Sequence, residues 1–566
     1  MNFELSLPLI WLVFFDLVAF IVLVDYQRKQ RVFAKNAQKG PWGLELPGIS
    51  DKRFFLFSLF PFYATISAFW SPNPTRAILT AGVLWLTFFA VFALLFVFPL
   101  LKPNPSWRRY FIESLFFSTA LVCVFCWVQC ILDIAGLSRS DTLLCAGCTF
   151  WTFGFPHPSG FAIEPQFMGN LLLAPTLLAL FLLAFPSTLS TQVRSKVNAE
   201  RTRVSFSRGS GLTRRSSGAT LRRQASRTRL EKRQTIVCFV LALLFSATLF
   251  LTLSRGAIYA YAIALLILFI FALARRAKWQ YIILIPVVSF FCTLAAQGTF
   301  SALSPTNDTF YSGVAKVVHQ LSLGIIDIRP RETTPPADLD TSTENSANSS
   351  TVSENSNNNS SDDSGDNEAI FDGYIPASTN VRLGLNDLAL RTWVGSPTNI
   401  LFGVGLGGAG LALNGAFPEH ELALPNAIVQ NEPISLLLEL GLVGALLVAF
   451  SLLLAFFAPL LPRRFLDGRD SKAPSPARHK SPQPQLAATR KIPEGQTVSL
   501  PTSLKSRLRQ SVFWSHSALP LLMSLLVAYL ITLNFFSGLP NALQIYLMPP
   551  LIFLIFAKDP HHLIDD

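Results

Sequence analysis

The chain has 566 residues, of which 51% are hydrophobic and only 14% are charged. Soluble proteins carry about 25% charged residues, so this composition excludes a string of soluble domains of the same total length. A net charge of +12 would suggest nucleic-acid binding in a soluble protein, but in a membrane protein the location of the charge matters more. With 49 Phe and a mean hydropathy of +0.42, the chain is predicted to be a multi-pass membrane protein without nucleic-acid partners.

Long apolar stretches recur along the whole sequence. A helix needs about 20 apolar residues to cross a bilayer. Counting such stretches predicts an all-α polytopic membrane protein with about 11 transmembrane helices. They cover residues 5–24, 54–70, 77–101, 110–136, 161–185, 235–253, 256–274, 279–297, 433–461, 514–534 and 539–557.

Basic residues concentrate in alternate connections between these stretches. Counted by spans, all the basic connections fall on one side of the membrane; they are residues 26–53, 102–109, 187–234, 275–278 and 463–513. Because Lys and Arg favour the cytoplasmic side, this pattern predicts an external N-terminus and a cytoplasmic C-terminus. The basic charge could contact anionic lipid head groups. Solvated topology signals are the simpler interpretation.

The connections also define the predicted domain organisation. One large external loop separates spans 8 and 9, and its acidic insert is too polar to bury a core, which predicts disorder. The two long basic cytoplasmic loops are predicted to be disordered for the same reason. The parts are residues 1–53 (first span and basic loop), 54–297 (spans 2–8, with the loop 187–234), 298–432 (external loop, with the insert 333–372), 433–462 (span 9), 463–513 (basic loop) and 514–566 (spans 10 and 11 and a cytoplasmic tail).

Two short motifs suggest cofactor or metal chemistry at first sight. Residues 405–410, Gly-Leu-Gly-Gly-Ala-Gly, fit the dinucleotide pattern GxGxxG, which requires a preceding strand and a following helix in a βαβ unit. An external loop offers no such unit, so a flexible or closely packed loop is predicted instead. Cys145 and Cys148 form a lone CxxC pair, which is only half of a zinc site. A local disulfide or idle thiols are predicted, with no metal and no cofactor.

Four carboxylates fall within or beside the predicted spans: Asp16, Glu113, Asp133 and Glu164. Carboxylates inside a membrane can mark a proton or ion path, which is the basis of a polysaccharide or lipid transporter hypothesis. These four are scattered and lie mostly near span ends. No single helix presents a row of them, so the pattern favours a transporter less than an enzyme.

Two arginines are candidates for binding an anionic substrate. Arg255 interrupts about forty apolar residues in a tight turn on the predicted external side. Arg382 begins a segment, residues 381–393, whose apolar spacing predicts a short amphipathic helix at the external surface. A planar guanidinium matches a diphosphate well, although both side chains could instead contact lipid head groups.

Five segments, in this order, carry a resemblance to a known family. They are residues 67–74 (Ser-Ala-Phe-Trp-Ser-Pro-Asn-Pro), 159–169 (Ser-Gly-Phe-Ala-Ile-Glu-Pro-Gln-Phe-Met-Gly), 253–257 (Leu-Ser-Arg-Gly-Ala), Arg382 with Pro397 and 402–407 (Phe-Gly-Val-Gly-Leu-Gly), and 430–444, which begins Gln-Asn-Glu and contains Glu-Leu-Gly-Leu-Val-Gly. Together with one large external loop, they resemble motifs of the bacterial O-antigen ligase and O-antigen polymerase family. The resemblance covers residues 54 to 460.

The resemblance implies an inverting, metal-independent glycosyltransferase of the bacterial inner membrane whose active site faces the periplasm. Its donor would be an oligosaccharide on undecaprenyl diphosphate, and its acceptor a glycan or a lipid A-core. Arg255 and Arg382 would bind the diphosphate of the lipid. A protein O-oligosaccharyltransferase shares this layout and stays open as an alternative, as does a transporter.

One position departs from the family pattern. Gln430 stands where the family usually has a histidine that is thought to activate the acceptor hydroxyl. Glutamine cannot act as a base at neutral pH, so Gln430 and Asn431 are predicted to bind the acceptor. Glu432 is the first candidate for the catalytic base and His420 the second. Otherwise leaving-group stabilisation acts alone, or the chain is a polymerase-like relative with different chemistry.

Overall fold

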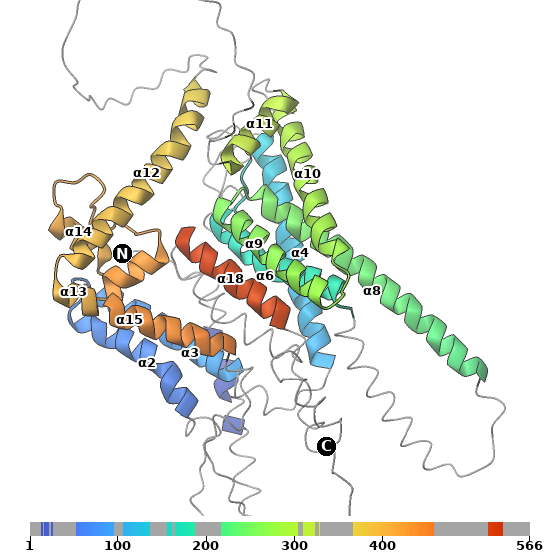
Figure 1. The fold of residues 1–566 in the computed structure, drawn as a ribbon, viewed down its shortest axis with the longest axis horizontal. Helices are drawn as coiled ribbons and strands as arrows, with labels where there is room; N and C mark the ends of the chain where they lie inside the picture. The colour runs from blue at the N-terminus through green and yellow to red at the C-terminus, as the bar shows by residue number, and fades with distance from the viewer. Residues whose placement is uncertain are drawn as a thin grey trace, which may run out of the picture. The chain divides into compact units, whose positions relative to one another are not determined.

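The computed structural model describes residues 13–14, 16–21, 24–25, 52–94, 106–135, 156–160, 165–186, 217–303, 309–322, 326, 328, 366–457 and 519–535. Every regular element in these ranges is a helix, which confirms the predicted all-α class (Figure 1). Within them, six helices are long and apolar enough to cross a membrane: Pro74–Phe92, Tyr110–Ile134, Pro165–Ala184, Arg255–Ala274, Gln280–Ala302 and Glu432–Ser451.

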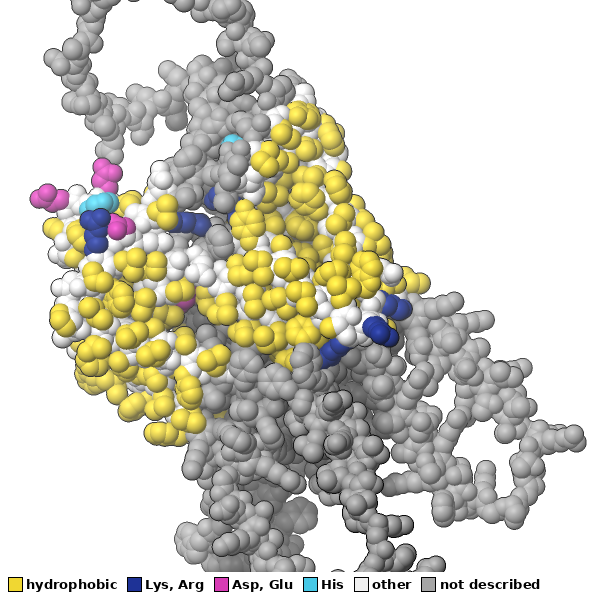
Figure 2. Space-filling model, in the orientation of Figure 1, with side chains coloured by type: hydrophobic (Ala, Val, Ile, Leu, Met, Phe, Trp, Pro, Cys, Tyr) yellow, Lys and Arg dark blue, Asp and Glu magenta, His cyan; other side chains and the backbone are white. Residues whose placement is uncertain are grey.

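These six helices overlap the predicted spans 3, 4, 5, 7, 8 and 9. Three shorter apolar helices, Ser58–Phe69, Thr235–Leu251 and Leu519–Asn534, overlap spans 2, 6 and 10. Most of span 1 and all of span 11 lie outside the described residues, so the total of 11 stays a prediction. Hydrophobic side chains cover most of the visible helical surface, as lipid-facing helices require (Figure 2).

The chain divides into two compact units. Unit 1 comprises Met1–Tyr110, Pro186–Ser210 and Asp387–Asp566, and unit 2 comprises Phe111–Phe185 and Gly211–Asn386. The helix α12 (Asp366–Val394) crosses the boundary between them. Each unit is described by itself below.

Unit 1 is built around three packed helices. The helix α2 (Lys52–Ile66) packs against α3 (Pro74–Phe92) and α15 (Glu432–Phe457), and α18 (Leu519–Phe535) packs against α15 (Figure 1). Between α2 and α3 lie the short helix η1 (Ser67–Phe69) and a turn. Asn73 begins α3, because its side chain accepts a hydrogen bond from the backbone N–H of Arg76 while Pro74 occupies the first helical position. The segment before α15 adds α13 (Pro397–Phe402) and α14 (Ala409–Ala416).

Unit 2 surrounds one buried helix. In α6 (Pro165–Ala184) every residue from 172 to 184 is buried, as expected for a helix that is apolar on all sides. The helices α8 (Ser217–Leu251) and α9 (Arg255–Ala274) pack against α6, and α10 (Gln280–Ala302) packs against α8. The unit also contains α4 (Ser106–Ile134) from residue 111 onward, and α11 (Phe310–Leu321), which packs on α10.

The helices of unit 2 alternate in direction, as the predicted span order requires. Gly169, near the start of α6, lies against Thr252 and Ser254 in the turn between α8 and α9. At the other end of α6, the backbone N–H of Lys278 donates to the carbonyl of Ala184 at 3.1 Å. The turn from α8 to α9 and the turn from α9 to α10 therefore lie at opposite ends of this bundle.

Two helices are longer than predicted. The helix α8 begins at Ser217, inside the basic loop 187–234, and α12 begins at Asp366, inside the acidic insert 333–372. The prediction of disorder therefore does not hold for residues 217–234 and 366–372, while the rest of both tracts lies outside the described residues. The physical reason is that extending an existing helix costs far less than nucleating one, so an apolar helix can carry a polar extension.

The close contact at Gly169 gives a first prediction. A Cβ atom there would lie 2.9 Å from the side chains of Ala257 and Ser254, so Gly169→Val should destabilise the protein by about 1–3 kcal/mol through overpacking. Thermal unfolding in detergent measures the loss. Gly82→Ala is the control, because no described residue lies within 4 Å of its added Cβ. Equal unfolding temperatures for the two variants would contradict the packing described for α6 and α9.

Candidate functional site

Arg255 is the first residue of α9 and follows an unusual turn. Leu253 has φ 49°, a left-handed conformation that non-glycine residues seldom adopt, and Ser254 before the helix is buried. The side chain of Ser254 makes no capping hydrogen bond to α9. The half-buried Arg255 therefore lies at the N-terminus of α9, where the helix dipole is positive. The two positive charges together favour the binding of an anion.

Residues 156–160 form an irregular segment that two glutamines hold against this turn. The Gln129 amide bonds the backbone of Gly160 in both directions, at 3.0 and 2.8 Å. The Gln297 Nε2 donates to the carbonyl of Pro156 at 3.0 Å. Gly160 has φ 63°, and a Cβ there would lie 2.9 Å from the Met168 sulfur, so the bend requires glycine.

His157 lies in this segment, and sequence analysis did not single it out. Its imidazole is largely buried, makes a backbone hydrogen bond with Thr252 and lies within electrostatic range of Arg255. Burial, and secondarily the Arg255 charge, lower the pKa of His157 from 6.5 to about 4. The side chain is therefore neutral at pH 7. The available signal was a histidine between two prolines directly before the family-like segment 159–169.

Arg382 lies on the buried face of α12. Leu385 and Ala389, three and seven residues further on, are both buried, whereas Arg382 itself is half-buried. Asn386, four residues on, has a buried side-chain oxygen that accepts no hydrogen bond from the described residues. By contrast, Arg391 is exposed and pairs with Asp387 at 2.8 Å. The predicted amphipathic helix 381–393 thus forms the C-terminal part of α12, with Arg382 on its inner side.

The glycine-rich segment 402–408 in unit 1 is closely packed, which confirms one of the two predicted alternatives. The backbone N–H groups of Val404 and Gly405 donate to the carbonyls of Leu438 and Glu439, both at 2.8 Å. A Cβ on Gly405 would lie 2.5 Å from the Cα of Ser71. The segment connects the helices α13 and α14, and the described elements around it are helices.

The turn after α2 closes on the same glycine segment. The Ser71 hydroxyl donates to the carbonyl of Leu406 at 3.0 Å, and the Leu406 N–H donates to the Ser67 hydroxyl at 3.3 Å. The Tyr63 hydroxyl donates to the carbonyl of Leu440 at 2.9 Å. Three family-like segments, residues 67–74, 402–407 and 430–444, therefore meet in one place.

Glu439 belongs to the family-like segment 430–444, but sequence analysis gave it no role of its own. Its carboxylate accepts a hydrogen bond from the Gly407 N–H at 2.9 Å and faces the N–H of Ala409 and the charge of Arg76. The Arg76 stem lies against Gly407, where an added Cβ would be 3.0 Å from the Arg76 Cγ. The available signal was that Glu439 is the one charged residue in the apolar run 433–461. Such a residue inside a span marks a functional or structural anchor.

The predicted acceptor residues lie at the start of α15. Asn431 caps this helix, because its Oδ1 accepts from the Ile434 N–H at 3.2 Å while its Nδ2 donates to the Asn534 carbonyl at 3.4 Å. Gln430 is different: its side-chain oxygen is buried and has no hydrogen-bond partner among the described residues. Glu432 occupies the first turn of α15, where its charge also favours the helix dipole.

His420 is exposed in the loop after α14. Its Nδ1 accepts a hydrogen bond from the Leu422 N–H at 3.2 Å, which leaves the other ring nitrogen to carry the proton. This arrangement closes a local turn. Among the candidate bases, Glu432 lies two residues after the unsatisfied Gln430, whereas the His420 imidazole bonds within its own loop.

The predicted site residues fall into two groups. Arg255 and Arg382 belong to unit 2, whereas His420, Gln430, Asn431 and Glu432 belong to unit 1. Cys145, Cys148 and Glu164 lie outside the described residues.

Two of the carboxylates predicted near spans lie on α4. Glu113 is exposed, and Asp133 is buried at the far end of the same helix, about 30 Å away by helix rise. Two acids so far apart on α4 do not make a proton path.

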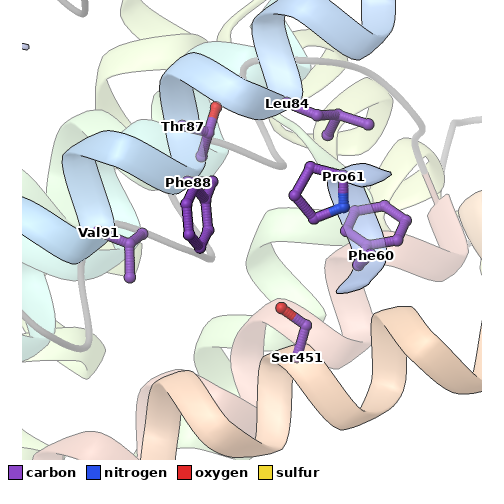
Figure 3. Close-up of a pocket in the computed structure, with 7 residues that line it drawn as sticks. All are labelled: Phe60, Pro61, Leu84, Thr87, Phe88, Val91 and Ser451. Atoms are coloured by element: carbon purple, nitrogen blue, oxygen red, sulfur yellow. The ribbon is translucent and has the colours of Figure 1, made fainter. Parts of the chain in front are cut away.

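A small apolar pocket lies in unit 1 between α2, α3 and α15. Phe60, Pro61, Leu84, Thr87, Phe88, Val91 and Ser451 line it (Figure 3). Two hydroxyl groups are its only polar side chains, and it contains no charged group. It lies well down α2 and α3 from the turn that holds Arg76, so it has no part in the chemistry of the charged residues.

No family model, curated protein or solved structure matches this chain. Within the described residues, no group of three or more His, Cys, Asp or Glu side chains lies together where it could hold a metal ion.

The contacts of Glu439 give a second prediction. Glu439→Ala leaves two backbone N–H groups and the Arg76 charge without their acceptor, so it should lower the free energy of unfolding by about 3 kcal/mol or more. Chemical unfolding in detergent measures this loss. The exposed Glu421→Ala is the control and should change stability little. If the Glu439 variant were as stable as the control, the carboxylate would not hold the glycine segment.

Proposed function

We propose that this protein is an integral membrane glycosyltransferase that transfers or polymerises undecaprenyl-diphosphate-linked oligosaccharide in surface polysaccharide synthesis. One observation carries the proposal. The segments that resemble the O-antigen ligase and polymerase family, although far apart in sequence, pack against one another within each unit. Segments 67–74, 402–407 and 430–444 meet in unit 1, and Gly169 at the end of 159–169 packs with 253–257 in unit 2.

The proposed chemistry begins with the donor diphosphate. The acceptor oxygen attacks the anomeric carbon, the bond from that carbon to the diphosphate oxygen breaks, and the electron pair leaves with the diphosphate. Negative charge grows on the leaving group, so fixed cations that face it lower the barrier. Arg255 at the start of α9 suits this role, and the half-buried Arg382 is the second candidate.

The acceptor side requires a group that orients a hydroxyl and a group that takes its proton. The buried Gln430 oxygen lacks a partner among the described residues, so it is available to accept a hydrogen bond from an acceptor hydroxyl. Glu432, two residues on, is the proposed base. Asn431, which caps α15, stays a candidate for contacting the acceptor.

The arginines give a third prediction. Arg255→Ala and Arg382→Ala should each reduce transfer by about 100-fold or more without loss of folded protein, because a transition-state cation is removed. The Lys variants should recover part of the activity, because a point charge replaces a bidentate fork. The measurement is formation of ligated or polymerised glycan by cells and by purified protein with lipid-linked donor.

The control for this experiment lies on the same helix. Arg391 is exposed and paired with Asp387, so Arg391→Ala should leave transfer close to normal. Near-normal transfer in both Arg255→Ala and Arg382→Ala would overturn the diphosphate assignment.

Glu432 gives a fourth prediction. Glu432→Gln keeps the size of the side chain but removes its basicity, so the proposed base predicts a fall in transfer rate of about 100-fold at unchanged protein level. Glu419→Gln, on an exposed loop, is the control. If the Glu432 variant retained full activity, Glu432 would serve only the helix dipole of α15.

A further inference from the structure

The helices α10 and α11 form a closely packed hairpin. A Cβ on Gly313 of α11 would lie 2.5 Å from the Ser301 Cβ and 2.8 Å from the Gln297 carbonyl of α10. Residues at three, four and seven positions after Gly313 lie on the same side of α11. These residues are Lys316, Val317 and Gln320, and all three are buried. The hairpin interface therefore mixes polar and charged side chains with apolar ones.

Three polar atoms in this hairpin lack the partners that buried polar atoms normally have. They are Gln297 Oε1, Ser301 Oγ and Gln320 Oε1, on side chains that are 0, 1 and 6% exposed, and the described part of the chain offers them no hydrogen bond. The orientation of the Gln297 side-chain amide follows from its partner. The Pro156 carbonyl can only accept a hydrogen bond, so the Gln297 atom beside it is the amide nitrogen, and the oxygen points the other way. Each such atom costs about 1–3 kcal/mol, so three together require an explanation.

The hairpin lies directly against the turn that presents Arg255. Val317 and Leu321 of α11 pack with Leu253 of that turn and with Leu294 of α10. The Tyr259 hydroxyl, one helical turn after Arg255, donates to the carbonyl of Leu321 at 2.7 Å. On its other side, Gln297 holds the segment that contains His157. The unsatisfied atoms thus adjoin the surroundings of Arg255 within unit 2.

We propose that the α10–α11 hairpin binds the sugar of the donor next to the diphosphate, through Gln297, Ser301 and Gln320. Two of the three atoms are amide oxygens, which accept hydrogen bonds, and sugar hydroxyls donate them. A metal cation would also suit such oxygens, but hard cations are usually held by carboxylates, and none of these three side chains is one. This inference rests on the proposed function, since it adds a sugar subsite to the proposed diphosphate site.

The test compares sugar 1-phosphates with inorganic phosphate as ligands of the purified full-length protein in detergent. Binding is measured by calorimetry for a panel of hexose and N-acetylhexosamine 1-phosphates. The ratio of sugar-phosphate affinity to phosphate affinity isolates the contribution of the sugar. Gln320→Met should lower that ratio about three- to tenfold, the value of one hydrogen bond, and leave phosphate affinity unchanged.

The matched control is Thr293→Val, one turn before Gln297 on α10. The Thr293 hydroxyl is buried but satisfied, because its one proton has two carbonyl acceptors within reach, Ala247 at 3.0 Å and Ser289 at 2.9 Å. This variant should lose thermal stability and keep the affinity ratio. Ligand-free Gln320→Met should show the opposite pattern, an equal or higher unfolding temperature, because it removes a buried atom without a partner.

Three outcomes would overturn the sugar subsite. In the first, the wild-type protein binds no sugar 1-phosphate more tightly than phosphate. In the second, Gln320→Met keeps the wild-type ratio. In the third, ligand-free Gln320→Met unfolds at a clearly lower temperature, which would mean that bound water already satisfies these atoms. Phosphate affinity that depends on Arg255, measured in the same titrations with Arg255→Ala, reports on the diphosphate site separately, so the two proposals can fail independently.

Discussion

The break in α15 at Gly441 is the constraint from which the architecture of unit 1 follows. Gly441 has φ 66°, so the helical hydrogen bonds stop there, and the carbonyls before the break lose their usual donors. In an apolar environment each unsatisfied backbone group costs several kcal/mol. Other parts of the chain supply replacement donors. The N–H groups of Val404 and Gly405 donate to the carbonyls of Leu438 and Glu439. The Tyr63 hydroxyl donates to the carbonyl of Leu440. The glycines of 402–408 are needed because only a backbone without side chains can approach a broken helix so closely.

The same constraint shapes unit 2 with different residues. Its irregular backbone lies at residues 156–160 and at the turn 252–254, between helices that are otherwise regular. Gln129 and Gln297 satisfy the first segment with side-chain amides, and α11 covers the second with Val317 and Leu321. Irregular backbone in a membrane protein is stable only where protein surrounds it, so these are also the places where polar side chains can be kept. Arg255 and His157 are found there for that reason.

The fold was predictable from sequence as far as hydropathy determines it. Nine of the predicted spans coincide with apolar helices, because a bilayer demands continuous apolar length and little else. Helix ends were less predictable: α8 and α12 extend into polar tracts, since extension from a formed helix needs no apolar face. The site was predictable as a set of segments but not as a set of contacts. Glu439 and Arg76 are 363 positions apart in the sequence. Their approach depends on how α3 and α15 both pack against α2, which no local pattern contains.

The buried and half-buried polar side chains of this molecule fall into two groups. Some have hydrogen-bond partners within the fold and stabilise it, and others lack such partners and are candidates for binding a substrate. Four of these side chains make hydrogen bonds to backbone groups: Glu439, Ser71, Asn431 and Gln129. A ligand could bind the same atoms only by breaking these hydrogen bonds. Gln430 in unit 1 and Gln297, Ser301 and Gln320 in unit 2 retain acceptors that the described residues leave unused. Gln297 holds the Pro156 carbonyl through its amide nitrogen, but the other three side chains give folding no such bond, and an apolar side chain of similar size would be more stable in their place. Their retention is explained if a substrate supplies the missing donors, and a hydroxyl-rich glycan carries more donors per unit volume than any other component of the proposed reaction.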